Sequence, residues 1–586
     1  MTRRPLATLA PVLVSVVLAA LVSGCVRVPD SGPVVETRSE GDVSSDTGFF
    51  YDPKPPQSGA APAEIVRQFL IAMQAVPVST KIAREFLTED AAASWTPQRE
   101  TITYPTPPTP TDIGQRVSIQ LPGANHLDSR RAWRGALPRS QRTITFDLTL
   151  EDGEWRIDDL PDALIVPQDW FQRNFRQVSL YYFDPTAAIL TPEPVFVPRG
   201  DQLPSTLTQA LLAGPSPGLS QVIQSFIPAG LEISVGVTIS DDGVADILLS
   251  GDGGQPSADT IEKMLAQLAW TLRQEPTVKS IQLSFNGEPV PLPGGVSSYR
   301  VDGGAQYDPA GVQASPLLYG LRRGIVVSGT PTGLEPVGGP LGEQELGMRS
   351  IGVSLDGSSV AGIGADGTSV LLGQLGSTSG AGVETVVSGG QDFLKPAWDF
   401  AGRIWLVDRT TRGARVSYVE DGAVRRLWVP GISGERVRAF LVSRDGSRLV
   451  AVIGGPDGDT LMLTRIEHRG TGKVVGATRA MRIGASVDSS LPIRAISWRS
   501  ASSVVVLNPP VATSSASVAT ASVDGSPPNQ DPSAIVVDGV VRALVGSPAG
   551  DEPVFGLTRR GLIAVDNVEQ RVVELPRGTS HLVYVG

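Results

Sequence analysis

The strongest constraint on the fold is a degenerate repeat in the second half of the chain. Five strand–turn–strand segments place their turns at Gly357, Gly402, Gly446, Ser502 and Gly550, which are 45, 44, 56 and 48 residues apart. A period of this length is typical of the four-stranded blades of β-propellers, whose strands are joined by tight turns. We therefore expect residues 309–586 to form an all-β propeller of five or six blades. An irregular β-sandwich is the alternative that the pattern leaves open.

Two further segments of this half are similar to each other. The sequence YGLRRGIVVSG begins at Tyr319, and FGLTRRGLIAV begins at Phe555. We interpret the two as first and last strands built on one template, as in a propeller whose ring closes on itself.

The N-terminus has the pattern of an export signal. Arg3 and Arg4 precede a nearly uninterrupted apolar run over residues 5–22, which indicates a signal peptide over residues 1–24 but is also long enough for a membrane span. The sequence that follows, Val22-Ser23-Gly24-Cys25, resembles a bacterial lipobox. The resemblance implies that signal peptidase II cleaves between Gly24 and Cys25 and that diacylglycerol is attached to Cys25.

These features predict a protein that is anchored by lipid to the outer face of the cell membrane. Cys25 is the single cysteine of the chain, and two or more acyl chains make such an anchor stable. Residues 25–61 are rich in Pro, Ser and Gly, so we expect the lipidated Cys to be followed by a flexible tether.

Two smaller domains are expected between the tether and the propeller. Residues 62–172 combine two amphipathic helices with alternating strands, and their FLT and DGEWRIDDLP segments resemble α+β domains of the NTF2-like class.

The second domain is expected over residues 173–297. It contains LTQALLAGPSPG, VADILLS and LAQLAWTLRQEPTVKSIQLSFNGEPV in that order, which resembles an α/β GerMN domain. Within it, Ile261, Met264, Leu265, Leu268 and Leu272 recur at helical spacing and predict a packing helix.

Composition argues against several classes of function. The chain has 586 residues, with 49 Lys and Arg against 60 Asp and Glu, and it has no long basic run. We therefore expect no nucleic-acid partner. One cysteine and three histidines cannot form a disulfide framework or a thiolate or imidazole metal cage, so no metal and no cofactor is predicted.

The sequence also contains patterns that imitate catalytic motifs. Residues 214–218 satisfy G-x-S-x-G, but Ser216 lies between two prolines after a helix, where the strained turn of a nucleophile elbow is disfavoured. The three possible bases, His126, His468 and His581, lie in other regions. We predict no catalytic residue and no enzymatic activity.

Three acidic or glycine-rich patterns are interpreted as structural. Asp158-Asp159 is expected in a solvated turn, because adjacent strand residues point to opposite faces. The acidic pair in Asp457-Gly458-Asp459 lacks the spacing of a calcium loop and is expected in a hairpin turn. Residues 470–473, Gly-Thr-Gly-Lys, lack the spacing of a P-loop.

The order of lipobox, two α/β modules and terminal propeller resembles the LpqB family of actinobacterial lipoproteins. The resemblance implies an accessory lipoprotein that binds the extracellular sensor region of the histidine kinase MtrB and modulates MtrAB two-component signalling, with effects on cell-wall homeostasis and cell division. Two alternatives remain open: a lipoprotein that binds peptidoglycan or another glycan of the cell envelope, and a cell-wall hydrolase or lyase. Of the family's functional residues, the sequence identifies Cys25.

Overall fold

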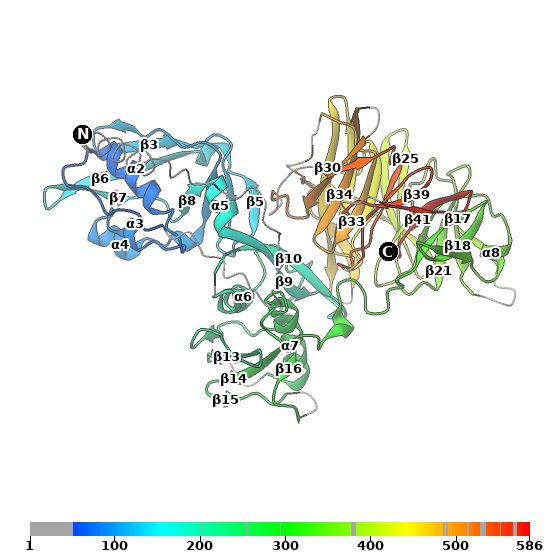
Figure 1. The fold of residues 1–586 in the computed structure, drawn as a ribbon, viewed down its shortest axis with the longest axis horizontal. Helices are drawn as coiled ribbons and strands as arrows, with labels where there is room; N and C mark the ends of the chain where they lie inside the picture. Colours follow the sequence, from blue (N-terminus) through cyan, green and yellow to red (C-terminus); the bar gives the residue numbers. More distant parts are fainter. Residues whose placement is uncertain are drawn as a thin grey trace, which may run out of the picture. The chain divides into compact units, whose positions relative to one another are not determined.

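The computed structural model describes residues 51–586 except 201, 253–255, 293–294, 377–381, 471, 485–486, 488–489, 513–514, 528–534, 551 and 567–570. These residues belong to the unit Phe50–Gly586, one of the two units into which the chain divides. They form several domains that are mostly β with few helices (Figure 1). Within this part of the chain, no helix has the length and apolarity needed to cross a bilayer. Gly24, Cys25, the predicted signal peptide and tether residues 25–50 lie outside the described residues.

The N-terminal region packs short helices against two small sheets. The sheets have the strand orders β2-β3-β6-β7 and β5-β4-β1-β8, and β1 pairs with β8 in parallel. The elements are α2 (Pro62–Ala72), α3 (Lys81–Arg84), α4 (Glu89–Ser94), β1 (Thr101–Tyr104), β2 (Thr111–Ile113), β3 (Arg116–Gln120), β4 (Asn125–Leu127), β5 (Trp133–Ala136), β6 (Thr143–Glu151), β7 (Glu154–Asp159), β8 (Leu164–Pro167) and α5 (Gln168–Asn174). Phe69 lies at the centre of their core, with ring centroids 6.4 Å from Phe86, 5.5 Å from Trp95 and 6.1 Å from Phe146.

Three details of this region differ from expectation. The second predicted helix is only the four residues of α3, because Thr88 begins a new helix, α4, by accepting a hydrogen bond from the Ala91 N–H (3.2 Å). Asp158 and Asp159 end strand β7 rather than forming a turn, although both are exposed as expected. Residues 51–61 contact the folded region: the Tyr51 N–H donates to the Val76 carbonyl (3.0 Å), and Ser58 Oγ donates to Glu154 (2.6 Å).

The central module combines a long hairpin with a mixed sheet. Its elements are β9 (Phe175–Phe183), β10 (Leu190–Pro198), α6 (Leu203–Leu212), β11 (Glu232–Ile233), β12 (Thr238–Ile239), β13 (Val244–Ser250), α7 (Ala258–Leu272), β14 (Ser280–Phe285), β15 (Glu288–Pro289) and β16 (Tyr299–Arg300). Strands β13 and β14 are parallel and are connected by α7. The predicted stripe on α7 is buried, so this helix is confirmed as a packing element.

The rest of the described chain forms six antiparallel sheets, which we number in chain order from β17. Sheets 2 to 6 each have four consecutive strands, with β32 as an extra strand of sheet 4, whereas sheet 1 combines β17, β18 and β19 with β41. They are sheet 1, β17 (Leu318–Arg322), β18 (Ile325–Thr330), β19 (Gly333–Pro336) and β41 (Thr579–Val583); sheet 2, β20 (Met348–Val353), β21 (Ser359–Gly364), β22 (Val370–Gln374) and β23 (Glu384–Val387); sheet 3, β24 (Ala397–Trp398), β25 (Ile404–Thr410), β26 (Gly413–Glu420) and β27 (Ala423–Leu427); sheet 4, β28 (Val437–Val442), β29 (Arg448–Gly455), β30 (Gly458–Arg469), β31 (Lys473–Ala477) and β32 (Met481–Arg482); sheet 5, β33 (Ala495–Ser500), β34 (Ser503–Ala512), β35 (Ser515–Ser522) and β36 (Ile535–Asp538); and sheet 6, β37 (Ala543–Val545), β38 (Phe555–Leu557), β39 (Gly561–Ala564) and β40 (Val572–Glu574). The short helix α8 (Pro340–Glu343) follows sheet 1.

The five repeats of the sequence correspond to sheets 2 to 6. Each repeat turn lies between the first and second strands of its sheet. In sheet 1 the equivalent first strand is β41, from the end of the described chain, which pairs antiparallel with β17 (Figure 1). Our interpretation of the Tyr319 and Phe555 segments was therefore wrong in one respect. They are the second and third strands of sheets 1 and 6, whereas the strand that follows sheet 6 and pairs with β17 is β41.

Candidate functional site

A five-residue turn of sequence Ser-x-Asp-Gly-Ser occurs three times in the sheets. The 354 turn (Ser354–Ser358) and the 443 turn (Ser443–Ser447) join the first two strands of sheets 2 and 4, and the 522 turn (Ser522–Ser526) follows β35 of sheet 5. In each, the glycine N–H donates to the carbonyl of the first serine, at 2.9, 2.8 and 3.0 Å, and the glycine φ is 70°, 67° and 77°. Glycine is favoured at this position because side chains are strained in the left-handed region.

The aspartate of each turn has one occupied and one outward-directed carboxylate oxygen. Its Oδ1 accepts the N–H of the last serine at 3.0, 2.9 and 2.9 Å, and the hydroxyl of the same serine at 2.8, 2.8 and 2.6 Å. These bonds fix the carboxylate, so that Oδ2 is left to bind a group outside the turn. We next describe what Oδ2 meets in each copy.

In the 443 turn, Oδ2 binds a guanidinium. Arg448 Nη1 lies 3.3 Å from both Asp445 Oδ2 and Ser447 Oγ. The other terminal nitrogen of Arg448 donates to Glu193 Oε1 of β10 (2.9 Å) and to the Pro192 carbonyl. The Arg448 side chain is fully buried, and this burial lowers its pKa despite the opposing charges of Glu193 and Asp445.

In the 522 turn, Oδ2 binds a carboxamide. Gln177 Nε2, from β9, lies 3.0 Å from Ser522 Oγ, 3.0 Å from Asp524 Oδ2 and 2.9 Å from Ser526 Oγ. Burial raises the pKa of Asp524, although the hydrogen bonds from the two serines and Gln177 act in the opposite direction. The β9–β10 hairpin is thus held by the 443 and 522 turns together.

The 354 turn faces a cleft instead. The cleft has a volume of about 440 Å³, within the range of ligand pockets. Its walls come from the β9–β10 turn, from residues 306–314, from the 354 turn and from the β24–β25 turn. The polar side chains that line it are Gln306, Asp308, Gln313, Ser354, Asp356, Ser358, Ser359 and Asp399. Its lining, as the structure describes it, contains no lysine or arginine.

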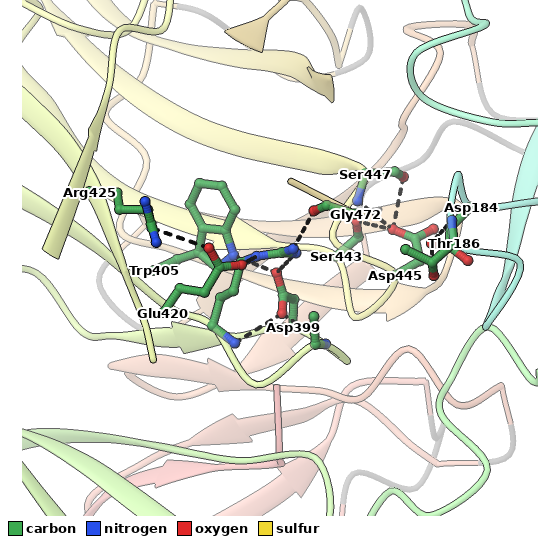
Figure 2. A network of polar contacts seen from close by, with 12 residues as sticks. Asp184, Thr186, Asp399, Trp405, Glu420, Arg425, Ser443, Asp445, Ser447 and Gly472 are labelled. Carbon is green, nitrogen blue, oxygen red and sulfur yellow. Dashed lines mark hydrogen bonds and ion pairs between the residues drawn. The ribbon is translucent and has the colours of Figure 1, made fainter. Parts of the chain in front are cut away.

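Behind this cleft, Asp399 and Arg403 organise a buried polar network (Figure 2). Asp399 Oδ2 accepts from Trp405 Nε1 (2.9 Å) and pairs with Arg403 Nη1 (3.2 Å). Arg403 also pairs through Nε with Glu420 Oε1 (2.7 Å), and Glu420 Oε2 pairs with Arg425 Nε (3.2 Å). Burial raises the pKa of Asp399, and the Arg403 charge opposes that shift. Because its partners are internal, we assign this network to structure.

A smaller cavity of about 100 Å³ contains His468 of β30. Asp184, Arg403 and Asp445 also line it, together with Pro185, Thr186, Val222, Phe400, Ala401 and Gly472. The His468 N–H of the main chain donates to the Gln221 carbonyl (2.7 Å), whereas its buried ring nitrogen Nδ1 has no hydrogen-bond partner among the described residues. Burial, with a contribution from Arg403, lowers the pKa of His468 to about 4. The imidazole is therefore neutral at neutral pH.

The structure does not bring Ser216 together with a histidine that could act as its base. Ser216 Oγ donates to Asp128 Oδ2 (3.1 Å), His126 Nδ1 lies 2.7 Å from Glu100 Oε1, and His468 and His581 belong to the sheets. Within the described part of the chain, the hydroxyl of Ser216 forms no hydrogen bond with a histidine. Asp457 lies in the β29–β30 hairpin turn, as predicted, and the following Asp459 is buried and pairs with Arg438 (3.3 Å). In the same part of the chain, no cluster of three or more His, Cys, Asp or Glu could hold a metal ion.

Comparison with known proteins gives the family. The model of the LpqB N-terminal domain matches residues 55–172, a model described as sporulation and spore germination matches residues 179–291, and the LpqB β-propeller model matches residues 324–581. Lipoprotein LpqB of Thermobifida fusca is 30% identical over 512 residues, which cover 77% of this chain and 80% of that protein. The chain belongs to the LpqB lipoprotein family. LpqB of Streptomyces coelicolor is also 30% identical, over 543 residues and 86% of each chain.

The LpqB family resemblance in the sequence is thereby confirmed, as are the germination-type domain and the propeller-like half. Among solved structures, the first GerMN domain of Bacillus subtilis GerM is 21% identical and covers 21% of this chain and 97% of that chain, with a TM-score of 0.18. The matching family descriptions name no reaction. Sequence analysis missed the 522 turn, although the letters Ser-x-Asp-Gly-Ser repeat those at 354 and 443.

Proposed function

We propose that the chain is a membrane-anchored accessory lipoprotein that binds the extracellular region of the sensor kinase MtrB and modulates MtrAB signalling, and through it the cell wall and cell division. Membership of the LpqB family over most of the chain is the observation that carries the proposal. In this proposal, signal peptidase II cleaves after Gly24 and lipid is attached to Cys25. The folded part then lies at the outer face of the membrane.

The proposal includes two finer features of the fold. We take the six sheets as the six blades of a propeller, since β41 and β17 join the two ends of the series, and we take residues 62–172 as an NTF2-like domain. Two exposed hydrophobic side chains at the outer strand of sheet 3 support a role in protein contact: Val424 of β27 (47% exposed) and Trp428, which directly follows β27 (70% exposed). Solvent-exposed aromatic residues are favourable anchors for a protein partner.

Binding of the purified MtrB ectodomain to the lipoprotein in detergent tests the proposal. We expect saturable binding that survives competition by soluble cell-wall fragments. Trp428→Ala should weaken binding if sheet 3 contributes, and Ile113→Ala, at an equally exposed site of the N-terminal region (76% exposed), is the control. Recovery of wall fragments alone, with no ectodomain bound, would reject this function and favour the glycan-binding alternative.

A further inference from the structure

We infer that the 354 turn is a binding site for a guanidinium or ammonium group of a ligand that enters the 440 Å³ cleft. The inference comes from comparison of the three copies of one turn within this chain. It does not depend on the proposed function, because it concerns the chemistry of a cleft and not the identity of a protein partner.

Both occupied copies bind nitrogen donors in the same way. The 443 turn uses its aspartate Oδ2 and last serine Oγ to bind the Arg448 guanidinium, and the 522 turn uses the same two atoms to bind the Gln177 carboxamide. The turn is therefore a preformed acceptor for N–H groups, held by its own hydrogen bonds before a ligand arrives.

The 354 turn has the same geometry without an internal donor. Asp356 Oδ1 accepts from Ser354 Oγ (2.6 Å), the Ser358 N–H (3.0 Å) and Ser358 Oγ (2.8 Å). Asp356 is exposed, and among the described residues its Oδ2 accepts no hydrogen bond. At the position of Arg448 relative to its turn, the 354 turn has Ser359, whose side chain is too short to fold back as the arginine does.

Charge selects a cation over a neutral amide. Burial opposes ionisation of Asp356, but the hydrogen bonds from Ser354 and Ser358 outweigh it and lower the pKa of this carboxyl, so it is charged at neutral pH. Asp308, which also lines the cleft, is partly compensated by the charge of Arg444: burial lowers the pKa of Arg444 to about 10, and Asp308 opposes this shift. No Lys or Arg charge contributes to the shift in the pKa of Asp356. A carboxylate in a cleft lined without lysine or arginine attracts a positive group.

Ligand-detected NMR on the purified lipoprotein tests the site with three probes. They are L-argininamide, the blocked tripeptide acetyl-Gly-Arg-Gly-amide, and the same tripeptide with neutral citrulline in place of arginine. We expect saturable binding of the arginine probes and at least tenfold weaker binding of the citrulline peptide. Similar affinity for argininamide and the arginine tripeptide identifies a free cation as sufficient, whereas tighter binding of the tripeptide identifies a peptide side chain. Either result supports the site.

Two variants and a matched control locate the binding. Asp356→Asn keeps the shape of the turn and should weaken binding of argininamide at least tenfold. Val312→Trp leaves the residues of the turn unchanged and fills the cleft from an exposed position of its lining (56% exposed), and it should also weaken binding. Asp366→Asn changes the other Asp-Gly turn of sheet 2, outside the cleft, and should have no effect. Unchanged binding in Asp356→Asn, equal binding of the citrulline peptide, or no saturable binding of any probe would overturn the inference.

Discussion

Single side chains explain why the sheets hold the β9–β10 hairpin. Glu193 and Gln177 are unremarkable in the sequence, yet Gln177 binds the 522 turn directly and Glu193 binds Arg448, the arginine that is held by the 443 turn. No local pattern marks such a pair, because the contact exists only once the two domains have folded. The turns themselves could be found from the sequence, because the same residue types repeat in each copy. The residues of the β9–β10 hairpin that contact them could not be predicted from the sequence.

His468 should make the protein less stable in mild acid. Its pKa is lowered from 6.5 to about 4 by burial, so between these two pH values the unfolded chain takes up a proton that the folded chain does not. Stability is therefore complete above pH 6.5 and falls as the pH decreases, by about 2 kcal/mol at pH 5 and about 3 kcal/mol below pH 4. Urea unfolding at pH 7 and pH 5 measures this loss.

The variant His468→Phe removes the titrating group while it keeps an aromatic ring in the cavity. It should lose most of the difference in stability between pH 7 and pH 5 that the native protein shows. An identical pH dependence in the variant would assign the effect to other groups.

At the level of strands, sheet 1 depends on the pairing of β41 with β17. β41 is short and its register with β17 shifts between Tyr319 and Leu321. Within β17, Gly320 faces β41 at close range: a Cβ at this position would lie 2.6 Å from Leu582 Cδ2 and 3.2 Å from the Ser580 carbonyl oxygen. The absence of a side chain at this glycine allows the two strands to pair.

Gly320→Ala should therefore destabilise sheet 1. We expect a loss of about 1–3 kcal/mol, the usual result of overpacking, in the urea unfolding of the sheets. Gly333→Ala is the control in the same sheet, because the only neighbour of its Cβ within 4 Å is Thr330 Oγ1 at 3.8 Å. Equal stability of the two variants would show that β41 moves freely enough to accept the methyl group.

For the molecule as a whole, the sequence predicted more of the fold than of the site. Repeats at blade-sized spacing predicted the sheets, and the apolar stripe on α7 predicted the packing helix of the central module. The cleft was not predictable, because its walls come from four separate segments that only the folded chain brings together. The strand that pairs with β17 was assigned to the wrong segment, because β41 lies more than 200 residues from its partner and no local pattern marks such a pairing.

The predicted anchor at Cys25 can be tested on the whole protein. Cys25→Ser should abolish labelling by fatty acid and release the protein from membranes or block its processing, because the serine hydroxyl cannot replace the thiol in lipid transfer. Ser23→Ala keeps a small residue in the lipobox and should preserve both labelling and membrane retention. Membrane retention and labelling of Cys25→Ser at the native level would contradict the anchor.

The pairing of β41 with β17 also determines when sheet 1 can be completed during synthesis of the chain. Sheet 1 has three of its strands once the chain has been synthesised to Pro336, but its fourth strand comes only with residues 579–583. Until then the open side of β17 is a bare strand edge, available to proteases and to neighbouring copies. A chain that stops before Thr579 therefore has every strand of sheets 2 to 6, whereas sheet 1 lacks the strand that pairs with β17.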